Sequence, residues 1–173
     1  MNQKAISYGL IGGIIVIALN LLIYLIDPAL LANWWVGLAS LPIVIIILIM
    51  GGLAIRKAEG GYITFGKAFL NMFVIGIVMA VLSTIYQVLL FHVIDPELPQ
   101  FIMEKSMENM AEMMSNFGMP EAQLEQAMSE AAASMEGQFS VGKQILGVIW
   151  GSVFYAVLAL ILALIVKRNP ENA

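Results

Sequence analysis

Methionine is the residue whose enrichment and spacing could support chemistry in this sequence. Eight of the twelve methionines lie between residues 97 and 142. Met103, Met107, Met110 and Met114 follow one another at intervals of four, three and four residues, which places their side chains on one face of a helix. Thioether sulfur is a soft ligand that suits Cu(I), so this stripe is a candidate metal site. Methionine also fills irregular apolar seams, and we favour this structural interpretation.

The remaining composition argues against an enzyme. The chain has no cysteine and a single histidine, His92, which excludes thiolate catalysis and zinc–thiolate sites. It contains neither a glycine-rich phosphate loop nor a recognisable set of nucleophile and base. The net charge of -4, without a basic patch, argues against nucleic acid as a partner. We therefore expect no enzymatic activity, no cofactor and no bound nucleic acid.

Long apolar stretches dominate the chain and must position any site. Of its 173 residues, 61% are hydrophobic and 12% are charged, with a mean hydropathy of +0.91, whereas soluble domains average about 25% charged residues. A membrane-spanning helix needs about 20 apolar residues. Four segments without Asp, Glu, Lys or Arg meet this requirement, at residues 5–26, 36–55, 68–94 and 144–166. The sequence predicts an all-α membrane protein, a single domain of residues 1–173 with four transmembrane helices in the lipid bilayer.

The basic residues predict how these helices are oriented. Lysine and arginine are enriched in the short cytoplasmic loops of membrane proteins. With the N-terminus in the cytoplasm, six of the eight basic residues fall on the cytoplasmic side, and only Lys105 and Lys143 fall outside. We therefore expect a multi-pass protein whose N- and C-termini are both cytoplasmic.

The segment 97–142 is the one sizeable aqueous part of the chain. Its apolar residues recur at helical spacing in two runs, with Gly118 and Pro120 between them as a stop and a restart. Two amphipathic helices bury their stripes best against each other, which predicts an extracytoplasmic α-hairpin between the third and fourth transmembrane helices. The segment carries eight of the twelve acidic residues, which favours contact with a protein over contact with anionic lipid. The candidate partner-binding residues are Glu104, Glu108, Glu112 and Phe117.

Small and uncharged polar residues mark further candidate sites within the apolar stretches. Glycines let helix backbones approach closely in lipid. We favour packing within a four-helix bundle, with homo-oligomerisation through one glycine face as the alternative. The candidate helix-packing residues are Gly9, Gly13, Gly76, Gly147 and Gly151. The polar residues, among them Asn20, Asn71, Ser83, Thr84 and Gln87, are expected to bond across helices, and a stripe through Asn71, Ser83 and Gln87 would be the mark of a transport pathway.

Two sequence runs carry a family resemblance. The run GYITFGKAF, residues 61–69, opens the third apolar segment, and the run YQVLLFHVIDPEL, residues 86–98, closes it. Together with the acidic, methionine-rich segment and the basic tail, they resemble the bacterial membrane family known as domain of unknown function 4199 (DUF4199). The resemblance covers nearly the whole chain and implies a small four-span protein of the inner membrane in Gram-negative bacteria. It brings no activity, substrate or catalytic residue with it.

Three functions follow as hypotheses. The first is a non-enzymatic accessory protein that contacts another membrane or periplasmic protein through its acidic hairpin. The alternative is a small oligomeric transporter or channel that uses uncharged polar residues. The third is a Cu(I)-handling protein that uses the methionine stripe.

Overall fold

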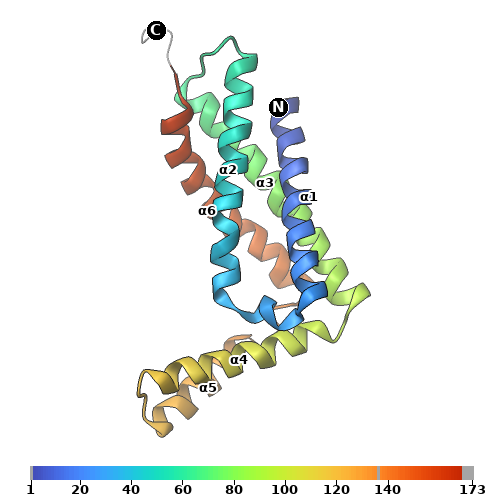
Figure 1. The fold of residues 1–173 in the computed structure, drawn as a ribbon, viewed down its shortest axis with the longest axis vertical. Coiled ribbons are helices and arrows are strands. Elements are labelled where there is room, and N and C mark those ends of the chain that lie inside the picture. Colours follow the sequence, from blue (N-terminus) through green and yellow to red (C-terminus); the bar gives the residue numbers. More distant parts are fainter. Residues whose placement is uncertain (1, 136, 169–173) are drawn as a thin grey trace.

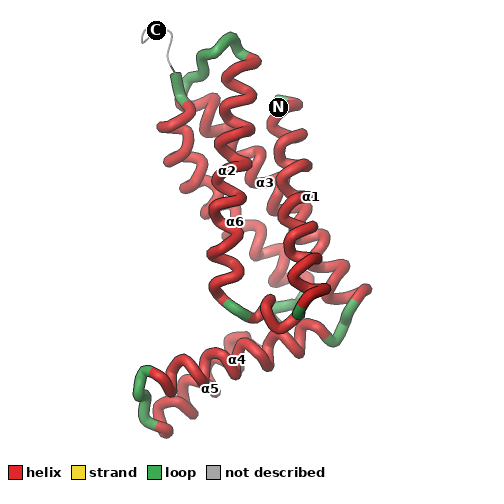
Figure 2. The backbone as a smooth tube through the Cα atoms, in the orientation of Figure 1, coloured by secondary structure: helices red, strands yellow, loops and turns green. Residues whose placement is uncertain are grey.

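The chain is helical throughout the part that the structure describes. The computed structural model describes residues 2–135 and 137–168, which form no β-strand (Figure 2). This confirms the predicted all-α class. In chain order the elements are α1 (Gln3–Ile26), the 3-10 helix η1 (Pro28–Ala32), α2 (Trp34–Ala58), α3 (Phe65–Leu89), the π-helix η2 (Leu90–Ile94), α4 (Leu98–Asn116), α5 (Glu121–Met135) and α6 (Val141–Val166).

Four of these helices are long and apolar enough to cross a membrane. They are α1, α2, α3 continued by η2, and α6, with 24 to 30 residues each, more than the ~20 needed to span the hydrocarbon core. Most of their apolar side chains lie on the outside of the bundle rather than in its core. Water would make such a surface unstable, whereas lipid solvates it. The chain is therefore a multi-pass membrane protein, as the composition predicts.

Two Asp-Pro pairs end spans and begin new helices. The Asp27 carboxylate accepts a hydrogen bond from the Ala29 N–H at 2.9 Å and caps η1. The Asp95 carboxylate accepts one from the Leu98 N–H at 3.1 Å, at the start of α4. Aspartate satisfies free N–H groups at a helix start, while the following proline cannot continue the preceding helix. The repeated Ile-Asp-Pro sequence thus fixes where α1 and η2 stop.

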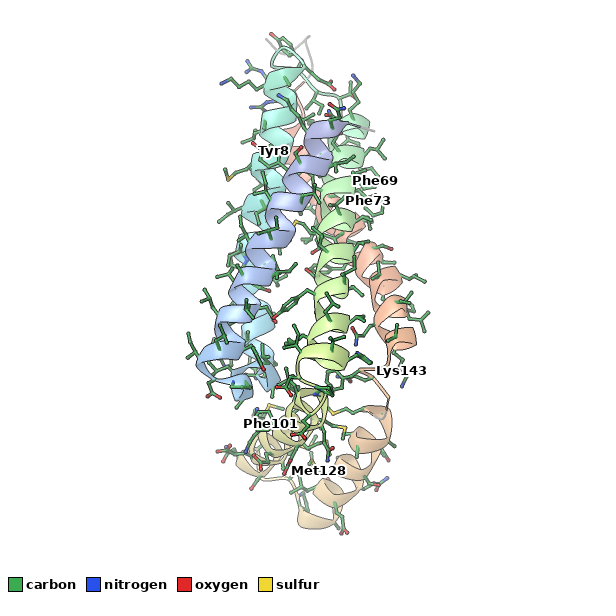
Figure 3. All side chains as sticks on the ribbon, turned by 90° about the vertical axis from the view of Figure 1, so that its right-hand side faces the viewer. Tyr8, Phe69, Phe73, Phe101, Met128 and Lys143 are labelled. Atoms are coloured by element: carbon green, nitrogen blue, oxygen red, sulfur yellow. The ribbon has the colours of Figure 1, made fainter. Side chains whose placement is uncertain are left out.

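Helix α3 is the centre of the bundle. It lies between α1 and α6, and α2 packs across all three (Figure 3). The buried core lies in one half of the bundle, where α2 contributes Leu48 and Ile55, α3 contributes Met72 and Ile75, and α6 contributes Val166. In the other half, near α4, no residue of α1, α2 or α6 is buried. One half of the bundle is therefore closely packed and the other is loosely packed.

Contacts between distant segments close the packed end of the bundle. The start of α1, the α2–α3 loop and the end of α6 all lie there (Figure 1). The Arg56 guanidinium donates a hydrogen bond to the Val166 carbonyl at 3.0 Å. The backbones of Ile63 and Arg168 exchange two hydrogen bonds of 3.0 Å. Lys67 pairs with Glu59 at 3.0 Å. These contacts tie the end of α6 to the α2–α3 loop.

The helical hairpin of α4 and α5 crosses the opposite end of the bundle. The first half of α4 is anchored there, because Leu98 and Ile102 are buried in a small cluster with Leu90. Asn109 also donates a hydrogen bond to the Asn33 side chain at 3.2 Å. Beyond this point α4 and α5 pack together and project past the bundle (Figure 1). Half of the hairpin is therefore held by the bundle and half extends away from it.

Candidate functional site

The acidic candidates for partner binding form an exposed row along α4. Glu104, Glu108 and Glu112 all lie on the surface. Glu108 pairs with Lys105 at 2.6 Å, and this hydrogen bond, together with the charge of Glu108, raises the pKa of Lys105. Lys105 therefore stays protonated at neutral pH and neutralises one carboxylate locally. The row remains predominantly acidic.

Phe117 lies at the projecting tip of the hairpin and is 83% exposed. It lines a groove of about 910 Å³ between the outer half of α4 and the start of α2. Trp34 and Met113 line the same groove, and Trp34 is also largely exposed. Large aromatic side chains in such a position are the kind that anchor protein interfaces. The structure thus places an apolar groove beside the acidic row.

The methionine stripe is half-buried. Met103, Met107, Met110 and Met114 are each partly shielded on α4, which packs against α5. This degree of burial is what an adaptable apolar seam between two helices requires. Among the described residues, no cluster of His, Asp or Glu that could hold a metal ion lies anywhere in the chain.

The five candidate glycines fall into two environments. A Cβ on Gly9 would lie 2.6 Å from Val78 Cβ, and one on Gly13 would lie 2.7 Å from a methyl group of Leu82. Gly76 is in equally close contact with the Tyr155 ring. Gly147 and Gly151 instead face open space, with no described atom within 4 Å. Packing within one chain therefore explains the first three glycines and leaves the two on α6 unexplained.

The uncharged polar residues do not form a continuous stripe. Asn71 lies near the packed end, where its amide donates a hydrogen bond to the Lys67 carbonyl at 2.8 Å. Buried Met72, Ile75 and Met79 lie between it and Ser83 along α3. The core of the bundle therefore interrupts the stripe through Asn71, Ser83 and Gln87 that the transport alternative would require.

Polar side chains gather instead in the loosely packed half of the bundle. A cavity of about 560 Å³ is lined by Asn20 of α1, by Ser83, Thr84 and Gln87 of α3, and by Gln144 of α6. A second cavity of about 280 Å³ between α1 and α2 shares Asn20 and Gln87 with it. Residues of α4 and of the segment before α6 also line the larger cavity. Lys143 lies where α6 meets the hairpin (Figure 3).

Comparison with known proteins places nearly the whole chain in one family. The profile of the family described as "Protein of unknown function (DUF4199)" matches residues 7–168. The chain belongs to DUF4199. The matched residues contain most of α1 and all of the other elements, including those that line the polar cavity. No curated protein and no solved structure matches the chain.

Sequence reasoning noted most of the polar residues of this DUF4199 chain but not their meeting point. From its sequence position Gln144 is only the first residue of the last apolar segment, and hydrogen bonds across helices are the expectation for the other polar residues. One signal could have brought them together. Asn20 lies six residues before the end of α1 and Gln87 seven before the end of η2. Because both spans end on the same side, these two residues lie at similar depth.

Proposed function

We propose that the chain is a non-enzymatic accessory membrane protein that binds another membrane or periplasmic protein through the α4–α5 hairpin. The observation that carries this proposal is the projection of the hairpin beyond the bundle. Phe117 and Glu112, the last acid of the row, lie on the part that projects, while Glu104 and Glu108 lie exposed on the half of α4 that the bundle holds. A basic partner surface would complement the row, and an apolar side chain of the partner would fill the groove beside Trp34.

The proposed location is the inner membrane, with both termini in the cytoplasm. The excess of basic residues at the packed end of the bundle supports this orientation. Because the chain has no cysteine, single cysteines can report the topology. We expect an impermeant maleimide to label Gln123→Cys on α5 in intact spheroplasts. It should label Ala58→Cys only after lysis. The reverse pattern would invert the orientation and place the hairpin in the cytoplasm.

Charge removal on α4 tests the partner surface. A photoreactive residue at Phe117 should yield a crosslinked adduct in intact membranes. The triple change Glu104→Gln, Glu108→Gln and Glu112→Gln should reduce this adduct about tenfold, since each exposed ion pair contributes at most about 1 kcal/mol. The adduct should also weaken as salt rises, because exposed charges are screened.

Two acidic residues of α5 provide the matched control. Glu125→Gln with Glu130→Gln removes exposed charges from the same hairpin but from the other helix, and should leave the adduct at the level of the unaltered chain. An adduct that is indifferent to both sets of changes would argue against recognition through the acidic row.

Transport by a small oligomer is the second candidate function. The polar cavity in the loosely packed half of the bundle favours it. Within one chain, however, buried Ile75 and Met79 lie between this cavity and the packed end. A route across the membrane would therefore require the core to rearrange or a second copy of the chain to contribute.

A further inference from the structure

Four side chains that line the larger cavity have no hydrogen-bond partner within the described protein. They are Asn20, Ser83, Thr84 and Gln87, none of which donates to or accepts from another group. Other hydroxyls and amides in the same spans do find partners. Ser152, for example, donates to the Ile149 carbonyl at 2.6 Å. The cavity thus brings four unpartnered polar side chains together, while the buried Tyr86 hydroxyl is another unpartnered group of α3 and lies outside the lining.

Such groups require an external partner in a membrane. The cost of removing an amide or hydroxyl from water without a hydrogen bond is about 1–3 kcal/mol in proteins. Lipid hydrocarbon offers no donor or acceptor. A polar molecule within the cavity would satisfy the side chains of α1 and α3 together. The cavity is thus suited to polar contents, either water or a ligand.

The charges around the cavity favour a neutral ligand. No Asp or Glu lines either of the two cavities. Lys143, the one cation among the lining residues, lies at the rim where α6 begins and already has an interaction within the protein. An ion buried among uncharged groups would lack a counter-charge and would be strongly disfavoured.

The hydrogen-bonding capacity of the lining matches hydroxyl groups. Carboxamides and hydroxyls both donate and accept, and a sugar hydroxyl does the same. Gln144 lies beside these groups, where its amide nitrogen donates to the Phe139 carbonyl at 2.7 Å and its Oε1 is buried without a partner.

The size and walls of the cavity suit a sugar-sized group. Its volume of about 560 Å³ falls within the ~300–1,000 Å³ of small-molecule sites. Phe91 and Phe139, in edge-to-face contact at 5.3 Å between ring centroids, form an apolar wall beside the polar groups. On the α6 side, Gly147 leaves open space next to the lining.

We infer that this cavity binds a neutral, hydroxyl-rich group, held by Asn20, Ser83, Thr84 and Gln87. The same chemistry is offered by a free sugar and by the headgroup of a neutral glycolipid. The inference is independent of the proposed partner surface, because none of these residues belongs to the acidic row.

The test uses the full chain in phosphatidylcholine nanodiscs, prepared without sugar-based detergent. One arm adds trehalose and measures its contact with the protein by saturation-transfer NMR. The other arm adds monoglucosyl diacylglycerol to the discs and counts retained lipid by native mass spectrometry. Binding in the first arm identifies a free sugar as the source, and binding in the second identifies a glycolipid.

Matched variants connect the binding to the cavity. Asn20→Leu with Gln87→Leu should reduce the bound signal at least tenfold, through loss of two or more hydrogen bonds of about 1 kcal/mol each. The control Asn71→Leu changes a residue of α3, the helix of Gln87, that does not line the cavity, and it should leave binding unchanged. Binding in neither arm, or equal binding by the double variant, would overturn the inference. A third result is possible, in which the unaltered chain binds neither probe and the double variant unfolds at a higher temperature than the unaltered chain. This result would also overturn the inference and would show that the cavity holds only water.

Discussion

Replacing Gly76 by alanine should lower the free energy of unfolding by about 1–3 kcal/mol, because the new methyl group would overlap the Tyr155 ring. The nearby atoms include Tyr155 Cβ at 3.0 Å and Cγ at 2.7 Å. They lie close to the backbone of α6 and cannot swing aside as a chain end could. The substitution therefore has to push α3 and α6 apart along the most extensive helix contact of the bundle. Thermal unfolding in detergent micelles measures the loss.

The same change at Gly151 should have the opposite sign. Among the described residues, no atom of another segment lies within 4 Å of the position that a Cβ at residue 151 would take. Alanine should therefore raise the free energy of unfolding through its better helix propensity alone, by about 0.8–1 kcal/mol. The two variants differ in environment and not in chemistry, which makes each the control of the other. Equal losses at both positions would contradict the described packing. A loss at Gly151 that disappears on dilution would place a second copy of the chain on this face of α6.

Truncating Leu98 to alanine should release the hairpin while the bundle stays folded. Leu98 is 2% exposed and packs with Leu90 and Ile102 in the cluster that holds α4. Loss of a buried leucine costs about 2–5 kcal/mol, which is large compared with the anchors that remain, Ile102, the contacts of α4 with η1 and the Asn109–Asn33 hydrogen bond. Hydrogen exchange should become fast across residues 98–116 and stay slow in the core around Met72 and Ile75.

Met113→Ala is the matched truncation on the same helix. Its side chain is 46% exposed, so removal should change exchange across α4 only slightly. Rapid exchange throughout α3 in the Leu98 variant would show instead that the hairpin and the bundle unfold as one unit. In that case the projecting hairpin could not act as a separate element.

The helical segments of this chain were predictable because their signals are local. A run such as residues 144–166 partitions into lipid by the sum of its own side chains, whatever its neighbours are. Asp27 and Asp95 stop the spans through contacts only two or three residues away. The stripes of α4 and α5 follow from helical spacing alone. Each of these features depends on residues close together in the sequence.

The contacts between helices were not predictable in the same way. Gly76 and Gly151 both lie in runs where small residues recur at helical spacing. Gly76 nevertheless contacts the Tyr155 side chain, whereas Gly151 has no neighbour from another segment among the described residues. Asn71 and Gln87 are both uncharged polar residues of α3, yet one bonds to its own helix and the other lines a cavity with Asn20. Sequence spacing does not distinguish the members of either pair.

The sequence by itself determined that the chain has four helices long and apolar enough to cross a membrane and where α1, η2 and α6 end, but it placed the end of α2 three residues too early, at residue 55 instead of Ala58. Only the tertiary structure decided which half of the bundle closes, which glycines are in contact and where the polar side chains meet. The physical reason lies in the solvent. Lipid is as apolar as the helix surfaces, so hydrophobicity places helices in the membrane but does not choose their partners. That choice rests on shape and on hydrogen bonds between segments far apart in the chain.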